Sequence, residues 1–533
     1  MGGGLLQLVA KGAQDVYLIN DPQITLFKNI FHRYTNFSYE TFQLNFDGNK
    51  KFGQEINCTI PLNGDLLSKA YLVIILNEDT SKKWGYVEKI GFNIINQISI
   101  SINGQTIDSQ TGEWLNIYHQ LHKNKGKDNS FNILNGNVPE MKKINVDHPK
   151  YTLYIPLQFW FCHHYGLSIP VIALEKNSIE IKVKLNEAIN CINYKDSNNN
   201  YYPSIKDIHL LVDYIYLDNI ERNKFIKKNH EYLINQVQIN EEKIPSYKHS
   251  YQLKFFHPSK YLIWLSDQSK YNSRNEYLNW NFNNNWEETK NDFAKLIWLS
   301  TRSGLNNAGT LINYSPDFYN IGDNPELIEN GNEILEKLSK KVIAELLFYD
   351  SDNNAEAKLN NVNLTKNDIT YEDMSITIKT IKDDLNTTTA QSNFLDLHKV
   401  SIISKFNYGN YVNGSDNPIV SSQLKLNGQE RFSKRDSLFF NYIQPKNHFN
   451  NIPNDGINIY NFSLNPKELQ PSGSCNFSRV DNTTLELTIG NNNSDNLGSY
   501  FKNNFKSGNI RFYTNNYNLL KISIMKAIIT YES

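Results

Sequence analysis

Strict alternation of apolar and polar residues is the feature that most limits what this chain can fold into. In Ile179–Leu185, four apolar residues alternate with three charged ones, and in residues 97–105 three isoleucines alternate with polar residues before an Asn-Gly pair. A period of two places the apolar side chains on one face of a strand, and Asn-Gly favours a type I′ hairpin turn. The pattern predicts antiparallel sheets, each with one buried face.

Similar patterns elsewhere in the 533 residues predict an all-β protein. Helical periodicity stands out only at residues 331–347, which we interpret as a short helix inserted against a sheet. Two polar stretches, 272–291 and 350–389, have few apolar residues and are predicted to be long surface loops. The further strands are predicted at 54–62, 69–76, 208–217, 261–265, 421–426, 457–464, 484–489 and 519–531.

Two strand motifs occur twice along the chain in the same order. Residues 100–105 (ISINGQ) resemble residues 424–429 (LKLNGQ), and residues 177–181 (NSIEI) resemble 483–487 (TTLEL). Each half then ends in a long apolar strand. One β-sandwich used twice, joined near residues 218–248, explains this order; chance similarity between short strands is the alternative.

Known catalytic and metal-binding patterns fail when they are compared with the chain. His230-Glu231 has Ile234 where a zinc protease needs its second histidine, and Asp350 begins a segment that lacks the glycine and glutamate of an EF-hand. The adjacent His163 and His164 would point to opposite faces of a strand, so we expect a buried or interface imidazole there. The sequence predicts no enzyme, no cofactor, and no catalytic, cofactor-binding or metal-binding residues.

The cysteines and the charge balance exclude further classes. Four cysteines without CxxC spacing favour a reducing compartment, and we interpret Cys162 and Cys475 as small buried residues. A net charge of −1 gives no field that would draw the chain to nucleic acid. The N-terminus lacks the pattern of a secretory signal, and the longest apolar run, 70–76, is far shorter than a membrane span. We therefore expect a soluble chain that begins with a flexible arm.

An ordered set of motifs resembles the major capsid proteins of the nucleocytoplasmic large DNA viruses, giant-virus members in particular. The resemblance covers nearly the whole chain. Residues 3–15 and 22–28 are similar to that family's opening arm and first strand. Other matching segments follow in order: Arg33-Tyr34-Thr35-Asn36-Phe37, 61–66, His257-Pro258, Ile263-Trp264, 426–428, Arg431-Phe432, Arg435-Asp436, Asn451-Ile452-Pro453, 456–458, 470–479 and 517–520.

This resemblance implies two tandem eight-stranded jelly rolls, three copies of which form a pseudo-hexagonal capsomer of an icosahedral shell. We accordingly expect an arm at 1–25, a first jelly roll at 26–217, a linker at 218–247 and a second jelly roll at 248–533 with inserted loops at about 267–395. The implied partners are further copies of the chain, minor capsid and penton proteins, and the neighbourhood of an internal viral membrane, with no direct contact to nucleic acid. The implied location is the virion, with assembly in the host cytoplasm.

Two other functions are compatible with a jelly roll. A carbohydrate-binding, lectin-like protein would use loop aromatics such as Trp280 and Trp286 to stack on sugar rings, although such residues more often pack at a loop base or a subunit contact. A cupin-type enzyme would need clustered histidine and carboxylate ligands, and the 12 histidines do not show that spacing.

Overall fold

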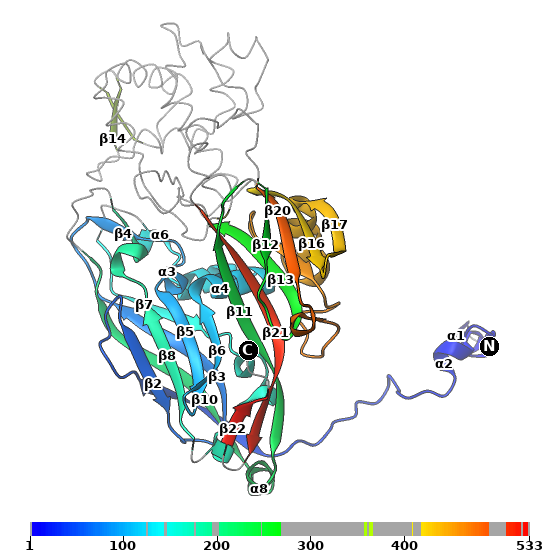
Figure 1. Ribbon diagram of the computed structural model, residues 1–533. Coiled ribbons are helices and arrows are strands. Elements are labelled where there is room, and N and C mark those ends of the chain that lie inside the picture. The colour runs from blue at the N-terminus through cyan, green and yellow to red at the C-terminus, as the bar shows by residue number, and fades with distance from the viewer. Residues whose placement is uncertain are drawn as a thin grey trace.

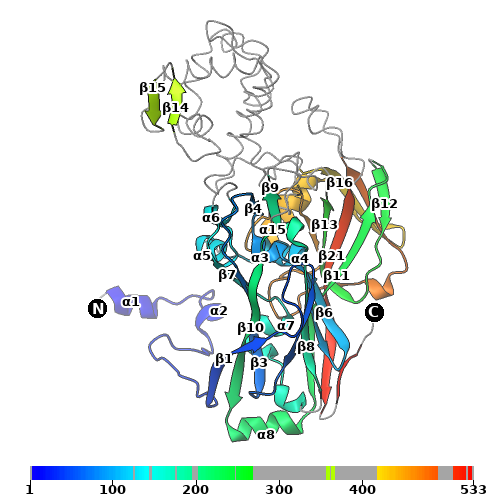
Figure 2. The same ribbon diagram turned by 90° about the vertical axis from the view of Figure 1, so that its left-hand side faces the viewer.

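The computed structural model contains two β-sandwiches side by side, with an N-terminal arm that projects away from both (Figures 1 and 2). It describes residues 3–123, 126–142, 147–174, 177–194, 202–246, 248–267, 356–359, 362–365, 408, 417–489, 508–523 and 526–530.

The first sandwich consists of two four-stranded antiparallel sheets. One has the order β1-β10-β3-β7 and the other β2-β8-β5-β6. Apart from the hairpin β5–β6, neighbours in each sheet are distant in sequence, so the chain crosses repeatedly between the sheets. The strands are β1 (Phe37–Asn45), β2 (Glu55–Ile60), β3 (Leu66–Leu76), β5 (Ile95–Ile102), β6 (Gln105–Thr111), β7 (Tyr151–Pro156), β8 (Ile179–Leu185) and β10 (Ile205–Leu217).

The second sandwich repeats this topology strand for strand. Its sheets have the orders β11-β21-β13-β18 and β12-β20-β16-β17, with β19 and β22 added to the first of them. Counted along the chain, both halves give the order 1-8-3-6 in one sheet and 2-7-4-5 in the other, which is a jelly roll used twice. The strands are β11 (His230–Lys243), β12 (Lys248–Gln252), β13 (Pro258–Asp267), β16 (Ile419–Leu426), β17 (Gln429–Asp436), β18 (Asn458–Asn461), β19 (Cys475–Asn476), β20 (Thr483–Ile489), β21 (Asn509–Ser523) and β22 (Lys526–Ile529).

The repeated Asn-Gly pairs form the same turn in both halves. Asn103 and Gly104 have φ values of 53° and 77°, and Asn427 and Gly428 have 49° and 80°. Positive φ at both central residues defines a type I′ turn. In each turn the asparagine side-chain oxygen also accepts a backbone N–H from the neighbouring strand connection, that of Ser178 or Asn482. The prediction of an internal repeat is therefore confirmed, as is the all-β fold.

Several predicted boundaries were wrong. Residues 22–28 form no strand, and the first strand begins at Phe37. The expected linker, 218–247, contains α8 (Asn219–Lys227) and β11, which pairs with β21 along its whole length, so the chain enters the second jelly roll at His230. The single strand predicted at 519–531 is instead the end of β21, which begins at Asn509, followed by the separate strand β22. The start of β21 was missed because it contains several asparagines, which are unfavourable in strands.

Short helices and strands occupy the connections. The expected helix at 331–347 and the expected loop at 272–291 lie outside the described residues, whereas the expected loop at 350–389 includes the hairpin β14–β15. The connecting elements are α1 (Gly3–Val9), α2 (Val16–Ile19), β4 (Trp84–Tyr86), α3 (Ile90–Asn93), α4 (Gly112–His122), α5 (Asp128–Leu134), α6 (Pro139–Lys142), α7 (Trp160–His163), η1 (Tyr165–Leu167), η2 (Val171–Leu174), η3 (Ala188–Cys191), β9 (Ile192–Tyr194), β14 (Glu356–Leu359), β15 (Val362–Thr365), the π-helix η7 (Phe439–Ile443), α15 (Gln444–His448) and η8 (Phe477–Arg479). Among the described helices, none is long and apolar enough to cross a membrane.

Strand β13 is buried on both faces. Leu262 and Trp264 belong to the core of the second sandwich, whereas Tyr261, Ile263 and Leu265 belong to the core that includes the first sandwich. An outer sheet face is normally wet in an antiparallel sandwich. Here the first jelly roll covers it, so the two halves share a continuous apolar interior.

Candidate functional site at the junction of the two jelly rolls

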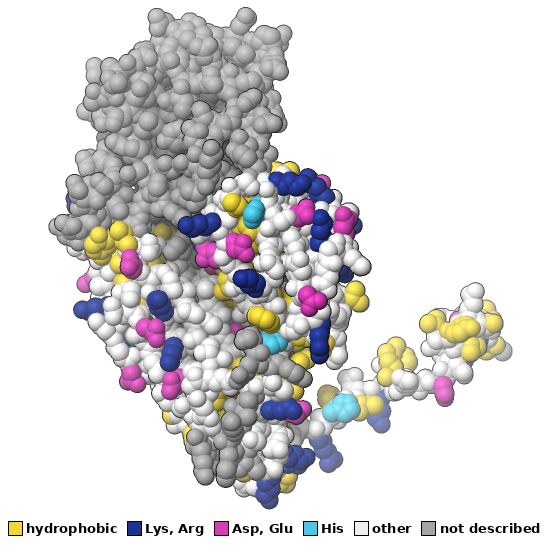
Figure 3. All heavy atoms as spheres, viewed as in Figure 1, with side chains coloured by type: hydrophobic (Ala, Val, Ile, Leu, Met, Phe, Trp, Pro, Cys, Tyr) yellow, Lys and Arg dark blue, Asp and Glu magenta, His cyan; other side chains and the backbone are white. Residues whose placement is uncertain are grey.

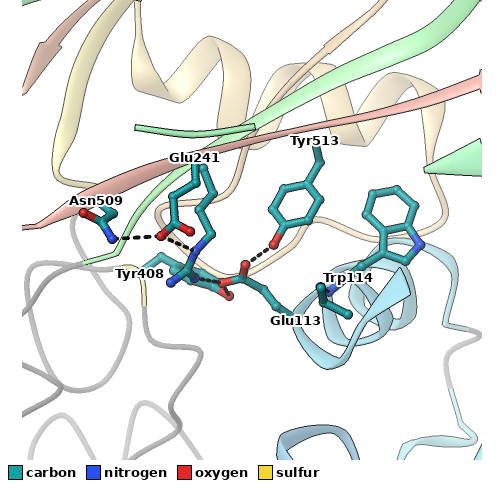
Figure 4. Close-up of polar contacts among 8 residues, drawn as sticks. Glu113, Trp114, Glu241, Tyr408, Asn509 and Tyr513 are labelled. Carbon is teal, nitrogen blue, oxygen red and sulfur yellow. Dashed lines mark hydrogen bonds and ion pairs between the residues drawn. The ribbon is translucent and has the colours of Figure 1, made fainter. Parts of the chain in front are cut away.

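Helix α4 carries the main contacts between the halves. It starts directly after β6, and the side chain of Thr111 caps it by accepting the backbone N–H of Trp114 at 3.1 Å. A Cβ on Gly112 would lie 2.0 Å from the carbonyl oxygen of Phe92, so only glycine fits where the helix leaves the sheet. This tight exit directs α4 onto the outer face of the β11-β21-β13-β18 sheet (Figures 2 and 4).

Trp114 is the apolar anchor of this junction. Its ring stacks near Tyr513 of β21, with centroids 5.8 Å apart, and near Tyr261 of β13, with centroids 6.5 Å apart. Only 1% of Trp114 is exposed. Burial of a side chain of this size stabilises by about 3 kcal/mol or more before packing is counted. The contact therefore holds the jelly rolls as one body.

Glu113 is the polar centre beside that anchor (Figure 4). Its carboxylate accepts hydrogen bonds from the hydroxyl groups of Tyr513 and Tyr408, the latter at 2.5 Å, and pairs with Arg511 at 2.5 Å. Arg511 also contacts Glu241 at 3.2 Å, and Glu241 accepts from Asn509 at 2.8 Å. Every member except Glu113 belongs to the second half of the chain, so this network fixes how the two jelly rolls are oriented.

The tyrosines of the network remain neutral donors. Burial, followed by the nearby charge of Glu113, raises the pKa of both Tyr408 and Tyr513 well above the ordinary value for a phenol. Neutral hydroxyls donate to the carboxylate, and Arg511 balances its charge. A buried carboxylate with three such partners is a structural element, because most of its lone-pair sites are occupied by hydrogen bonds within the junction.

Strand β6 makes a second contact with the other half. Asp108 accepts the backbone N–H of Val237 in β11 at 3.0 Å and the side-chain amide of Gln110 at 2.8 Å. Desolvation by burial raises the pKa of Asp108 to about 6 despite these hydrogen bonds. The carboxylate thus supplies a hydrogen-bond acceptor to the backbone N–H of Val237, which lies on an edge strand and would otherwise lack a partner.

The end of α4 is held by an asparagine-rich loop. The backbone N–H of Asn454 donates to the side chain of Gln120 at 2.9 Å, and the side chain of Asn450 donates to the carbonyl oxygen of His122 at 3.2 Å. Asn451 likewise donates to the carbonyl of Lys123. These side chains satisfy the last carbonyls of the helix, which gives the sequence block at 451–453 a structural role.

The histidines and cysteines predicted from the sequence lie apart from this network. His163 ends α7 rather than standing in a strand; burial lowers its pKa to about 3, and its ring stacks on Tyr118 with centroids 5.5 Å apart. His164 is exposed. Burial raises the pKa of the Cys162 thiol to about 12 and also raises that of Cys475. In the described part of the chain no three His, Cys, Asp or Glu residues are grouped to hold a metal ion.

Sequence reasoning missed the junction residues, although one signal was present. Trp114, Ile117, Tyr118 and Leu121 recur at spacings of three and four, which is the apolar stripe of a helix. Trp280 and Trp286, considered for sugar binding, lie outside the described residues.

The N-terminal arm is the other prominent surface. None of residues 3–37 is buried, and hydrophobic side chains are visible along the arm in Figure 3. The exposed hydrophobic residues of this segment include Leu6, Leu18, Leu26, Phe27 and Phe31. Exposed apolar side chains gathered in one segment are typical of surfaces that associate with other molecules.

Comparison with known proteins gives consistent matches. A family model described as the N-terminus of the major capsid protein matches residues 25–218, and one described as the large eukaryotic DNA virus major capsid protein matches 221–525. Capsid protein 1 of Acanthamoeba polyphaga mimivirus is 30% identical over 100% of both chains, and the major capsid protein of Phaeocystis pouchetii virus is 32% identical over 98% of both.

Solved structures share the fold. The crystal structure of VP54 of PBCV-1, fitted into a reconstruction of the virophage Sputnik, matches with a TM-score of 0.62 and 23% identity, covering 96% of this chain and 100% of that one. The Faustovirus major capsid protein matches with a TM-score of 0.58 and 11% identity, covering 96% and 94%.

Proposed function

The chain belongs to the family of major capsid proteins of large eukaryotic DNA viruses, and from that premise we propose that three copies associate into a pseudo-hexagonal capsomer. It is a structural protein of the virion capsid rather than an enzyme. We propose further that these trimers tile an icosahedral shell.

The observation that carries the proposal is the repeat of one strand order in both halves, held together by the junction at Glu113 and Trp114. Two equivalent sandwiches in one rigid chain supply six equivalent units in a trimer, which is the number a hexagonal lattice needs. Because the strands of each jelly roll are paired within two short sheets that pack face to face, only the outermost strand of each sheet is open to pairing with another chain.

Membership of this family also supports proposals about the domain boundaries of the chain, its partners and the place where it assembles. We propose an N-terminal arm, a first jelly roll, and a second jelly roll that starts at β11 and has a long insertion between β13 and β16. Minor capsid and penton proteins are the proposed partners besides other copies of the chain. Assembly in the host cytoplasm near an internal membrane fits a family whose shells enclose one.

Solution mass tests the proposal. Light scattering on the purified chain is expected to give three times 61.8 kDa, about 185 kDa, and negative-stain images are expected to show hexagonal outlines. A monomer of 61.8 kDa that persists as concentration and salt vary would contradict it. Stabilisation by a sugar, with no trimer, would favour the carbohydrate-binding alternative.

A further inference from the structure

The junction inside the chain uses one defined set of elements from each jelly roll. The first jelly roll contributes β6 and the start of α4, and the second contributes the outer face of its β11-β21-β13-β18 sheet. Because both halves have the same topology, each half also possesses the elements that the other half uses. The counterparts of β6 and α4 are β17 and η7, and the counterpart of the covered sheet is β1-β10-β3-β7.

The counterpart of α4 begins in the same way. The side chain of Asp436 accepts the backbone N–H of Phe439 at 3.1 Å, as Thr111 does with Trp114 at 3.1 Å. When the two caps are superimposed, Leu438 occupies the position in the second jelly roll that Glu113 occupies in the first. Glu113 is 9% exposed because it lies against the second jelly roll, whereas Leu438 is 57% exposed. A large apolar side chain therefore stands uncovered at the position that makes the internal junction.

The matching sheet face is less covered. In β13 the outward residues Tyr261, Ile263 and Leu265 are almost fully buried by the first jelly roll. In the equivalent strand, β3, the central outward residue Val73 is 1% exposed, but Tyr71 and Ile75 on either side of it are half-buried, and Tyr154 on neighbouring β7 is 38% exposed. This is an apolar face of the same kind, with less cover than its counterpart has inside the chain.

The two edge strands beside these surfaces, β17 and β1, are also more exposed than their counterparts at the internal junction. β17 is exposed at every position except Phe432, and β1 is exposed at all but Phe42 and Leu44. Their counterparts, β6 and β11, are mostly buried or half-buried where they meet.

We propose that β17 and Leu438 of one copy cover the β1-β10-β3-β7 face of the next copy, so that the contact between chains repeats the contact within the chain. This inference rests on the proposed trimer and names its interface. Leu438 is then expected to pack near Ile75, at the end of the sheet where Asp207 is paired with Ile75. Repeating one contact around the ring closes it without a second type of interface.

The test compares the solution mass of four forms of the full chain at equal concentration. Leu438→Asp is expected to raise the dissociation constant of the trimer at least about tenfold, since an unpaired carboxylate would be buried in the contact. Ile220→Asp, on the exposed helix α8, is the matched control and is expected to remain trimeric, because Ile220 is 70% exposed and lies outside the contact. Circular dichroism checks that both variants are folded.

Charge complementation removes misfolding as an explanation. The double variant Leu438→Asp with Ile75→Lys is expected to recover the trimer, because the new lysine faces the new carboxylate. If wild type is a trimer and Leu438→Asp remains one, the proposed interface is wrong while the trimer stands. If Leu438→Asp dissociates without recovery in the double variant, the pairing with Ile75 is wrong. A monomeric wild type would overturn the trimer itself, and with it this interface.

Discussion

The hydroxyl of Tyr513 donates a hydrogen bond to the carboxylate of Glu113, although the two residues are 400 positions apart and belong to different jelly rolls. Arg511, two residues before Tyr513 on the same strand, pairs with the same carboxylate. A buried charge without partners is costly. Glu113 is therefore tolerated only when the second jelly roll is folded and docked, which links the two halves energetically.

Substitution of Glu113 by Gln should loosen this link. The variant replaces one carboxylate oxygen by an amide N–H₂ that faces a hydrogen-bond donor, and it removes the negative charge that pairs with Arg511. We expect a loss of about 2–3 kcal/mol in the free energy of unfolding, measured by urea denaturation. The control is Glu231→Gln, which removes an exposed pair with Lys521 at 3.0 Å and should cost less than about 0.5 kcal/mol. Equal effects of the two substitutions would contradict a special role for Glu113.

Trp114→Ala should cost more, because it removes the apolar anchor. The cavity between Tyr261 and Tyr513 cannot close without moving the jelly rolls, so we expect a loss of about 3–5 kcal/mol. Trp114→Phe keeps one aromatic ring and should lose clearly less. Thermal unfolding followed by near-ultraviolet circular dichroism measures both, and an alanine variant within about 1 kcal/mol of wild type would show that the junction does not depend on this ring.

The raised pKa of Asp108 predicts that the stability of the fold depends on pH. Its pKa in the folded chain is about 6, above the ordinary 3.8, so the folded state holds the proton more tightly than the unfolded state does. The stabilisation from protonation is complete below about pH 3.8 and is lost as pH rises through 6. Asp108→Asn, which is neutral at every pH, should exceed wild type in stability at pH 7 by up to about 3 kcal/mol and lose that advantage near pH 4.

Unfolding midpoints of the wild type and of Asp108→Asn, measured in parallel between pH 4 and pH 8, check this. The difference should appear between pH 4 and 6 and remain constant above about pH 7. A difference that does not change with pH would show that Asp108 is charged in the folded chain throughout, with Val237 and Gln110 supplying enough hydrogen bonding to offset burial.

The sequence could predict the sandwiches but not the junction. Alternation in Ile179–Leu185 and the two Asn-Gly turns depend on local geometry, which a pattern records directly. Glu113 shows no such pattern, because its partners lie on β21 and are adjacent only after both jelly rolls have folded. Strand β11 was mistaken for a linker because its many polar residues lack alternation; pairing with β21, and contact with the first half, make it a strand. The junction and strand β11 thus depend on contacts between residues far apart in sequence, which a local pattern does not record.

Deletion of residues 1–30 should leave the stability of the fold unchanged. None of the described residues of this segment, 3–30, is buried, and their backbone contacts are local, such as that of Asn20 with Val16. We therefore expect the thermal midpoint to change by less than about 2 °C. A deletion that extends through residue 45 is the contrasting control, because it removes β1, exposes the edge of β10 and should lower the midpoint strongly. If the shorter deletion already lowers it by more than about 5 °C, the arm packs on its own chain, and its apolar side chains would not be available to a partner.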